Sequence, residues 1–311
     1  MKTLSIIVPC YNEEEVIKEC YSSIKSVLDA LDRDYRILFV NDGSTDHSQE
    51  ILSSIALEDN KVTVINFSRN FGHQAAVTAG IHYCTTDFAI IMDADLQDPP
   101  ELIPDILSRQ QEEKANVVYC VRKSRSGESK FKFWTSRKFY RTFNQISDDK
   151  FPLDAGDFRL IDSTIIKEFN KFKERGKYVR GLISWVGFKQ IPFYYQRGAR
   201  RGGKSKYPVR KMFSFASAAL FYFSKKPLQI STSLGFIAVL VGIIMALWFV
   251  LGKLFGYTDA ESGWTSLMIT IIFFGGVQLL TIGVLGRYIG ILFDEVKERP
   301  EYIIADIINS K

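Results

Sequence analysis

Two aspartates separated by one residue, Asp93 and Asp95, directly follow the apolar run Phe88–Met92. Carboxylates this close together repel one another unless a cation lies between them. In extended backbone, residues i and i+2 point to the same side, so the two carboxylates could share one ion. Ligation by oxygen alone suits Mg²⁺ or Mn²⁺, and a diphosphate would supply further oxygens. The pair predicts a divalent-metal site; a solvated turn is the alternative.

A third acidic residue, Asp42, ends another apolar run. Strand-like segments alternate with helix-like segments in the first part of the chain, and they cover residues 4–10, 35–40, 62–67, 88–93 and 116–121. This alternation predicts an α/β fold with a mostly parallel sheet and helices on both faces. Ligands of such sheets bind outside the carboxyl ends of the strands. We therefore expect Asp42, Asp93 and Asp95 to share one crevice.

Several common kinds of site lack their motifs. No GxGxxG follows the first strand and no GxxxxGK[ST] occurs, which argues against dinucleotide-binding and P-loop chemistry. The four cysteines show no CxxC spacing, and His47, His73 and His82 lack the spacing of metal ligands. A nucleotide bound in the crevice would have to be held by carboxylates and a metal.

Two long stretches, Pro227–Gly252 and Ser262–Gly286, contain no Asp, Glu, Lys or Arg. Each exceeds the roughly 20 residues that cross about 30 Å of hydrocarbon, so they predict a transmembrane hairpin; a pair of buried core helices is the alternative. Basic residues gather on the outer flanks, at Lys225, Lys226, Arg287, Lys297 and Arg299, and only Lys253 lies in the loop. The positive-inside rule then predicts a multi-pass protein of the inner (plasma) membrane with both termini in the cytoplasm. The N-terminal sequence MKTLSIIVPCYNEEE does not have the pattern of a signal peptide.

Basic residues are concentrated in two further stretches. Residues 197–211 hold seven Lys or Arg and no acid, and residues 122–141 contain Glu128 as their only acid. Beside a membrane segment, such stretches indicate anionic lipid or a phosphorylated substrate rather than nucleic acid. Residues 208–226 carry five Phe or Tyr between basic ends, which is typical of an amphipathic helix in the membrane interface.

Four motifs together resemble a known family. PCYNEEE, VNDGSTD, FSRNFGHQAAVTAG and DADLQDPPE are similar, in this order, to segments of glycosyltransferase family 2, which has the GT-A fold. The resemblance is closer to its polyprenyl-phosphate branch, the dolichol-phosphate mannose synthase-like enzymes. Bacterial members of this branch include undecaprenyl-phosphate glucosyltransferases with two C-terminal transmembrane helices. The resemblance covers nearly the whole chain.

The resemblance implies roles for individual residues. Those expected to line the nucleotide-sugar pocket are Pro9, Tyr11, Asn12, Glu13, Asp42, Asp93 and Arg122, with Asp42 accepting hydrogen bonds from the base. Asp93, Asp95 and Gln97 would serve the metal, Mg²⁺ or Mn²⁺, and Asp95 is also a candidate catalytic residue. An anionic diphosphate needs such a cation before it can approach these carboxylates.

The segment FPLDAGDFRLID, residues 151–162, resembles the acceptor side of the family. Asp157 matches the acid that is often assigned as a base. A phosphomonoester is already largely a dianion at neutral pH, since its second pKa is about 6, so Asp157 could instead orient the substrates. The residues expected to contact the acceptor or its phosphate are Arg125, Asp154, Arg159, Arg200, Arg201, Lys204 and Lys206.

Together these features predict a catalytic domain at 1–207, an interfacial helix at 208–226, membrane helices at 227–252 and 262–290 joined by an external loop at 253–261, and a cytoplasmic tail at 291–311. The expected reaction is inverting transfer of one sugar from a nucleotide-diphosphate sugar, UDP-glucose first, to polyprenyl phosphate, undecaprenyl phosphate first. Other donors, namely GDP-mannose, UDP-N-acetylglucosamine and a UDP-aminopentose, stay open, as does a non-catalytic membrane scaffold. Small residues in GIIMA and FFGGVQ allow a homo-oligomer.

Overall fold

The computed structural model describes residues 2–122, 155–175, 177–196, 224–255 and 263–309. These form two compact units. The first unit holds the sheet and its helices, and it includes the C-terminal residues from Arg299 onward. The second unit contains two long helices. Each unit is described by itself below.

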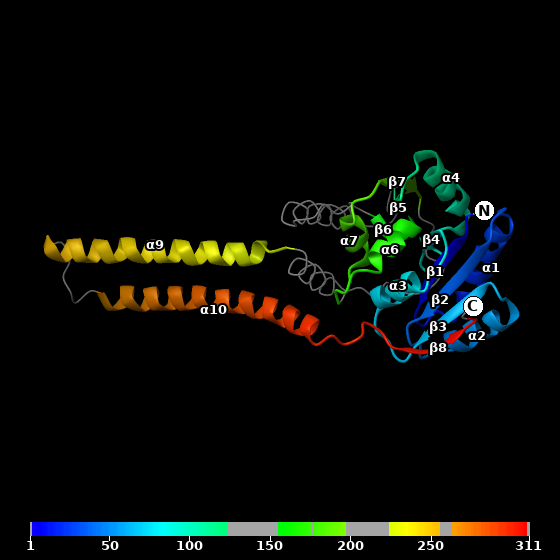
Figure 1. The fold of residues 1–311 in the computed structure, drawn as a ribbon. Coiled ribbons are helices and arrows are strands. Elements are labelled where there is room, and N and C mark those ends of the chain that lie inside the picture. The colour runs from blue at the N-terminus through cyan, green and yellow to red at the C-terminus, as the bar shows by residue number, and fades with distance from the viewer. Residues whose placement is uncertain (1, 123–154, 176, 197–223, 256–262, 310–311) are drawn as a thin grey trace. The chain divides into compact units, whose positions relative to one another are not determined.

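The first unit is built on an eight-stranded sheet of strand order β7-β5-β6-β4-β1-β2-β3-β8 (Figure 1). The strands are β1 (Leu4–Cys10), β2 (Tyr35–Asn41), β3 (Val62–Phe67), β4 (Phe88–Ile91), β5 (Val117–Arg122), β6 (Ala155–Asp162), β7 (Gln190–Tyr195) and β8 (Ile304–Ile308). The four central strands β4, β1, β2 and β3 are parallel to one another. β6 lies antiparallel between β4 and β5, and β8 is antiparallel to β3. The predicted α/β fold with a mostly parallel sheet is confirmed.

Helices cover both faces of this sheet. They are α1 (Ile17–Asp29), α2 (Ser48–Glu58), α3 (His73–His82), the 3-10 helix η1 (Pro100–Leu102), α4 (Ile103–Glu113), α6 (Ser163–Phe169) and α7 (Val179–Trp185). Alternate residues of β1 serve opposite faces: Ile6 and Val8 pack in the cluster with α1, α2 and α4, whereas Ile7 packs with α3, α6 and α7. Strands buried on both faces explain the nearly continuous apolar runs in the sequence.

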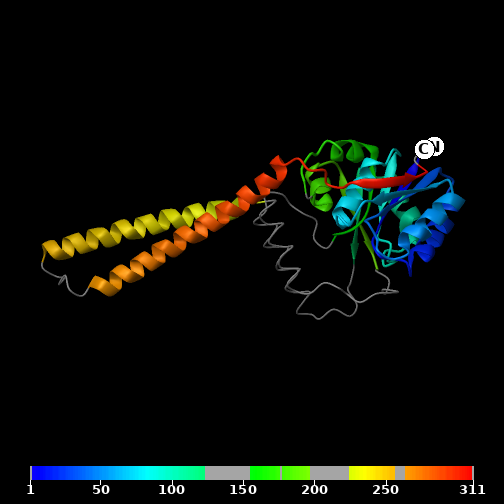
Figure 2. The same cartoon turned by 90° about the horizontal axis from the view of Figure 1, so that it is seen from below.

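The C-terminal segment departs from the expected tail at 291–311. α10 (Trp264–Val296) continues to Val296, and β8 then adds a strand to the edge of the sheet beside β3 (Figure 2). β8 gives hydrogen-bond partners to an edge that β3 would otherwise expose. Its five residues IADII follow charged residues and carry no turn motif, so no clear sequence pattern predicts this strand.

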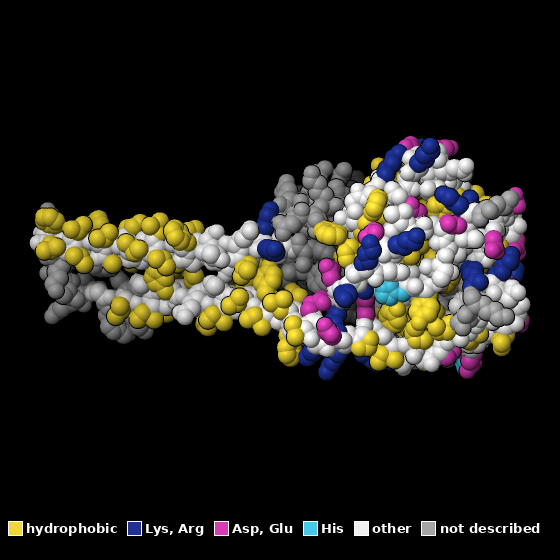
Figure 3. All heavy atoms as spheres, in the orientation of Figure 1, with side chains coloured by type: hydrophobic (Ala, Val, Ile, Leu, Met, Phe, Trp, Pro, Cys, Tyr) yellow, Lys and Arg dark blue, Asp and Glu magenta, His cyan; other side chains and the backbone are white. Residues whose placement is uncertain are grey.

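The second unit consists of α9 (Lys226–Leu254) and α10, which run side by side in both ribbon views (Figures 1 and 2). Both are long and apolar enough to cross a membrane, over Lys226–Gly252 and Thr270–Val296, and almost none of these spans is buried. Apolar side chains lie along much of their visible surface (Figure 3). Soluble proteins rarely leave apolar patches of this extent in water, so the two helices indicate association with a membrane.

Candidate functional site

The loops after β1 and β2 are joined by hydrogen bonds that involve the predicted nucleotide-pocket residues. The Asn12 amide donates to Ser44 Oγ at 3.0 Å, and Asn12 Oδ1 accepts from the Thr45 amide at 2.8 Å. Asn12 has a positive φ of 54°, a conformation that asparagine tolerates better than most residues. The Glu13 amide donates to Ser48 Oγ at 2.9 Å. These contacts fix two strand ends as one surface of the crevice.

Pro9 and Tyr11 flank this surface differently. Pro9 is buried within β1, whereas Tyr11 exposes 44% of its surface at the strand end. An exposed aromatic ring beside a backbone that turns sharply is suited to stack on a planar ligand. Of these two residues, only Tyr11 presents a side chain to the outside.

Asp42 is buried and holds the loop that precedes α3. Its Oδ1 accepts from the Phe71 amide at 2.7 Å, and its Oδ2 accepts from the Gly72 amide at 2.9 Å. Gly43 has a φ of +61°, and a Cβ there would lie 2.3 Å from the backbone carbon of Arg69. Burial raises the pKa of Asp42, and the two amide hydrogen bonds partly offset that effect. In this structure the carboxylate organises the loop; its contact with a base stays a prediction.

The acidic segment after β4 forms a turn, not the extended backbone that we expected for Asp93 and Asp95. Strand β4 ends at Ile91, and residues 94–95 lie in a turn. Asp95 Oδ1 accepts from the Gln97 amide at 3.1 Å, and Leu96 has a positive φ of 54°. Gln97 is largely buried. The three predicted metal residues therefore lie on one tight turn at the carboxyl end of β4.

Asp93 points toward a cluster that comes from three other elements. Its Oδ1 lies 3.9 Å from Nε2 of His73, which begins α3, and the same nitrogen lies 3.1 Å from Asp157 Oδ2. Arg180 of α7 donates to both oxygens of Asp157, from Nε at 2.6 Å and from Nη2 at 2.8 Å. Ligand atoms of His73, Asp93 and Asp157 all lie within 4.8 Å of one another. Asp93 and Asp157, the acids predicted for the donor side and for the acceptor side, thus lie in one cluster.

The electrostatics of the two acids differ. Burial, with the nearby Asp157, Asp98 and Asp95 charges, raises the pKa of Asp93 to about 6, although His73 acts in the opposite direction. Burial also acts to raise the pKa of Asp157, but the Arg180 charge and the His73 hydrogen bond outweigh it and hold that pKa well below its usual range. Asp157 is therefore ionised at neutral pH and is a poor general base.

This donor set fits a divalent cation. Asp93 is a carboxylate whose ionised form is disfavoured by burial and by neighbouring acids, and a cation would relieve that cost. Asp95 and Gln97 add oxygen atoms on the same turn. Asp157 is less suited to the ion because Arg180 already occupies both of its oxygens.

Arg159 is placed differently from its predicted role. It exposes only 2% of its surface, lies in β6 between β4 and β5, and donates from Nη2 to the Gly156 carbonyl at 2.9 Å. Burial lowers its pKa to about 10, while Asp157 acts to raise it. In this structure the side chain supports the backbone beside Asp157, and its contact with the acceptor phosphate stays a prediction.

Several predicted residues cannot be placed. Arg125, Asp154, Arg200, Arg201, Lys204 and Lys206, together with most of the two basic stretches and of the interfacial helix, lie outside the described residues. Arg122 is the last residue of β5, and only its backbone is described. β4 and β5 are both antiparallel to β6, so they run in the same direction, and β5 is also parallel to β7. Arg122, at the carboxyl end of β5, therefore lies at the same edge of the sheet as Asp42 and Asp93.

Two residues of the cluster were missed by the sequence reasoning. His73 lacks a second ligand at helical spacing, and Arg180 lies outside every motif. His73 stands inside FSRNFGHQAAVTAG, one of the motifs that carry the resemblance, so its position in a motif was an available signal. No comparable signal marks Arg180, because its partner Asp157 is 23 residues away and meets it only through the packing of α7.

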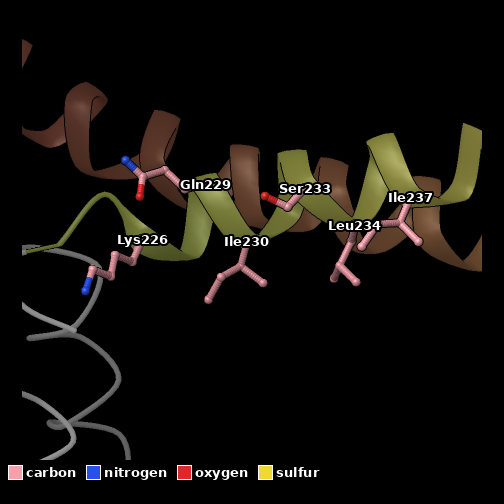
Figure 4. Close-up of a pocket in the computed structure, with 6 residues that line it drawn as sticks. All are labelled: Lys226, Gln229, Ile230, Ser233, Leu234 and Ile237. Carbon is pink, nitrogen blue, oxygen red and sulfur yellow. The ribbon is translucent and has the colours of Figure 1, made fainter. Parts of the chain in front are cut away.

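A groove of about 330 Å³ lies along the first turns of α9, far from these strand ends in the sequence (Figure 4). It is lined by Lys226, Gln229, Ile230, Ser233, Leu234 and Ile237. These residues recur at intervals of three and four, as on one side of a helix. The lining carries no acidic residue, so the groove lacks the chemistry of the strand-end crevice.

Comparison with known proteins decides the family. The family described as "Glycosyl transferase family 2" matches residues 5–169, more than half of the chain. The chain belongs to glycosyltransferase family 2. The match includes the strand ends that carry Asp42, Asp93 and Asp157, so the predicted glycosyltransferase family is confirmed.

Relatives of this glycosyltransferase match it over nearly its whole length. The uncharacterised glycosyltransferase YkcC of Bacillus subtilis is 45% identical over 96% of this chain and 92% of its own. A prophage bactoprenol glucosyl transferase homologue of Escherichia coli is 36% identical, covering 98% and 99% of the two chains. Among solved structures, mannosyl-3-phosphoglycerate synthase from Rubrobacter xylanophilus aligns with a TM-score of 0.50 at 15% identity, over 70% of this chain and 72% of that one. This last likeness bears on the fold alone, which is the GT-A fold.

Proposed function

We propose that this glycosyltransferase transfers one sugar from a nucleotide-diphosphate sugar to a polyprenyl phosphate. The donor that we propose is UDP-glucose, and the acceptor is undecaprenyl phosphate. The observation that carries the proposal is the 36% identity, over 98% of this chain and 99% of the relative, with a protein named as a bactoprenol glucosyl transferase homologue. A related protein of Shigella flexneri, named as a bactoprenol glucosyl transferase, is likewise 36% identical over 97% of both chains. The two apolar helices agree with a lipid-borne acceptor.

The donor is held by the strand-end loops in this proposal. Tyr11 would stack on the base, and the loops fixed by Asn12 and Asp42 would form the walls of its pocket. Asp93, Asp95 and Gln97 would hold Mg²⁺ or Mn²⁺. When bound, the ion neutralises the leaving diphosphate. Arg122, at the end of β5, is a candidate for further contact with phosphate oxygens, which guanidinium groups bind well.

The acceptor needs orientation more than deprotonation. The phosphate oxygen of the lipid attacks the anomeric carbon from the face opposite the leaving group, which inverts the configuration, and the bond from that carbon to the diphosphate breaks. A lipid phosphate is already anionic at neutral pH. Asp157, kept ionised by Arg180, therefore orients sugar hydroxyls or the acceptor and does not remove a proton.

In the membrane, we place the loop at 253–261 outside and the catalytic unit with both termini in the cytoplasm. The flanking basic residues and the apolar spans of α9 and α10 support this orientation. The basic residues Arg125, Arg200, Arg201, Lys204 and Lys206 would then face anionic lipid and the acceptor phosphate.

The test uses membranes that contain the full chain, undecaprenyl phosphate and a panel of radiolabelled nucleotide sugars. Label should pass from UDP-glucose to the lipid extract, and EDTA or Asp95→Asn should lower the transfer by at least about 100-fold. EDTA removes the cation that stabilises the leaving diphosphate, and the variant removes a carboxylate proposed to hold that cation. Asp105→Asn, an exposed acid of α4, is the matched control and should leave transfer unchanged. If the lipid were labelled from a different nucleotide sugar, that nucleotide sugar would replace UDP-glucose as the proposed donor. If no donor labelled the lipid while UDP binding was intact, the proposal that undecaprenyl phosphate is the acceptor would be wrong.

A further inference from the structure

The segment that follows α10 reaches both sides of the crevice. Two of its residues, Glu301 and Tyr302, precede β8: Glu301 bonds Lys177, just before α7, and Tyr302 stacks on Phe67, the last residue of β3. The chain thus passes from the second apolar helix, after Val296, into the wall of the catalytic unit within a few residues.

The first contact supports the loop held by Asp42. The ring of Tyr302 stacks on Phe67 with centroids 5.0 Å apart and planes at 9°, and Phe67 meets Phe71 edge to face at 5.8 Å. The Ser68 amide donates to the Ile303 carbonyl at 2.9 Å. Phe71 in turn supplies one of the two amides that bind Asp42. The loop between β3 and α3 is therefore packed on the C-terminal segment on one side and bonded to Asp42 on the other.

The second contact supports Asp157. Lys177 and Glu301 form an ion pair at 3.0 Å, with side chains that expose only 5% and 13% of their surface. Lys177 lies three residues before Arg180, which grips Asp157 with two hydrogen bonds. A largely buried pair fixes the start of α7 more strongly than an exposed pair would, because solvent screens it less.

A third contact runs through buried amides. Asp306 Oδ2 accepts from Asn66 at 2.9 Å, Asn66 Oδ1 accepts from Asn41 at 2.9 Å, and Asn41 Oδ1 accepts from the Ser44 amide at 3.1 Å. Ser44 Oγ accepts from the Asn12 amide in the loop after β1. Asn41 and Asn66 are almost completely buried, and their bonds hold the ends of β2 and β3 in one arrangement.

We propose that the C-terminal segment, residues 301–306, positions the donor site, with Tyr302 and Asp306 acting on the loops around Asp42 and Glu301 acting on Asp157 through Lys177. These are positioning residues and touch no substrate. The proposal rests on the proposed function only for the identity of the reaction that they assist. The donor site is then fully formed only when the chain that follows α10 is docked on β3.

The test compares Tyr302→Ala and Asp306→Ala with Asn309→Ala in the full chain in detergent. Asn309 follows β8, outside residues 301–306, and lies at the other end of β3, where its side-chain amide donates to the Val62 carbonyl at 3.1 Å. Asp306 is exposed, so its variant should fold. The readouts are UDP affinity with Mn²⁺, amide exchange at Phe71 and Gly72, and the donor KM and kcat.

We expect Tyr302→Ala to weaken UDP binding and raise the donor KM by roughly threefold to tenfold, the range for loss of an aromatic pair, and to speed exchange at Phe71 and Gly72. Tyr302→Phe, which keeps the stacking and loses only the 2.9 Å contact with His82, should restore most of the affinity. Asp306→Ala should weaken UDP binding in the same direction. Asn309→Ala should lower the melting temperature alone.

Equal effects of all three alanine variants on UDP affinity would reduce the segment to a stabilising strand and overturn the proposal. Unchanged UDP affinity and exchange in Tyr302→Ala and Asp306→Ala would overturn it as well. If the natural sequence fails to transfer sugar to the lipid, the proposed function fails, but UDP affinity and amide exchange still decide this inference.

Discussion

At the residue scale, the ionised Asp93 carboxylate that a metal would need lowers the stability of the folded protein when no metal is bound. Its pKa is raised to about 6 by burial and then by its acidic neighbours, above the value of about 3.9 in an unfolded chain. Because the folded pKa is the higher one, stability without metal falls as pH rises from about 4 through 6. Asp93→Asn should therefore raise stability at pH 7.5 by roughly 1–2 kcal/mol, after solvent screening, and abolish stabilisation by Mn²⁺.

Thermal melting of the full chain with and without Mn²⁺ measures both effects. The gain from Mn²⁺ in the natural sequence should be larger at pH 7.5 than at pH 5, where Asp93 is mostly protonated. Asp105→Asn should keep the full gain. A variant at Asp93 that melts lower than the natural sequence without metal, and still gains from Mn²⁺, would contradict the assignment.

Arg180 determines the charge state of Asp157. The pKa of Asp157 is depressed, so its contribution to stability is present above the unfolded pKa of about 4 and is lost as pH falls toward the folded value. Arg180→Gln leaves a nearly buried carboxylate without its cation, and the expected cost at pH 7 is about 3 kcal/mol, the lower end for a buried pair because Arg180 is partly exposed.

Urea denaturation at pH 7 and at pH 3.5 gives the test of Arg180. The difference in unfolding free energy between Arg180→Gln and the natural sequence should shrink at the lower pH, because Asp157 of the variant is more readily protonated once the Arg180 charge is gone. Arg109→Gln, which removes an exposed helix pair, should cost less than about 1 kcal/mol at both pH values. A cost for Arg180→Gln that does not change with pH would assign Arg180 to packing alone.

Sequence reasoning placed Asp42 and Asp93 at one sheet edge because parallel strands bring their carboxyl ends together whatever their separation in the chain. It did not give the geometry within the site. The turn after β4 replaced the extended backbone assumed for Asp93 and Asp95, since Leu96 takes a positive φ that no local pattern announces. The contacts of His73 and Arg180 depend on how helices pack on the sheet, which spacing does not encode.

At the element scale, the close approach of α3 to β1 depends on Gly80. A Cβ at this position would lie 2.2 Å from Cγ2 of Ile7, a fully buried residue on a central strand. In an exposed helix, Gly→Ala stabilises by about 1 kcal/mol. Here overpacking costs about 1–3 kcal/mol, and the stiff β-branched Ile7 has little freedom to move. Gly80→Ala should therefore destabilise by roughly 1–2 kcal/mol.

The check on Gly80 is a double-mutant cycle with Ile7→Ala. The double variant should be more stable than the sum of the two single effects predicts, because the removed methyl makes room for the new Cβ. Since α3 begins with His73, Gly80→Ala should also weaken UDP binding in this proposed site. Additive effects would mean that the backbone of α3 moves and Ile7 does not carry the clash.

The sequence predicts strands well where apolar runs alternate regularly with helical segments, and less well where this alternation stops. The first five strands follow from apolar runs that helices separate, and all five are present. The segment that contains β6 was interpreted as the acceptor side from its resemblance to the family, not as a strand. Its position between β4 and β5 explains the buried Phe158 and Leu160. β8 is an edge strand with one exposed side, so its hydrophobic signal is weak.

At the scale of the whole molecule, two charge-free runs in the sequence correspond to helices that are longer than either run. α9 covers Lys226–Leu254 and α10 covers Trp264–Val296, so charged residues at their ends are helical too. Within the pair, Tyr288 donates to the Ser224 carbonyl at 2.6 Å, and Gly242 leaves room for the ring of Phe274. These contacts join α9 and α10 as a hairpin; its orientation in a membrane stays a prediction from flanking charge.

That orientation is testable with one introduced thiol, because the four natural cysteines are buried. In spheroplasts, a membrane-impermeant maleimide should label Thr258→Cys, in the loop between the helices, without permeabilisation. Ser54→Cys, on an exposed position of α2, should be labelled only after permeabilisation. The segments before α9 and after α10 are rich in Lys and Arg, which opposes the translocation of these segments across the membrane, whereas the loop between the helices carries only Lys253. Labelling of Ser54→Cys in intact spheroplasts would invert the topology and place the donor site away from cytoplasmic nucleotide sugars.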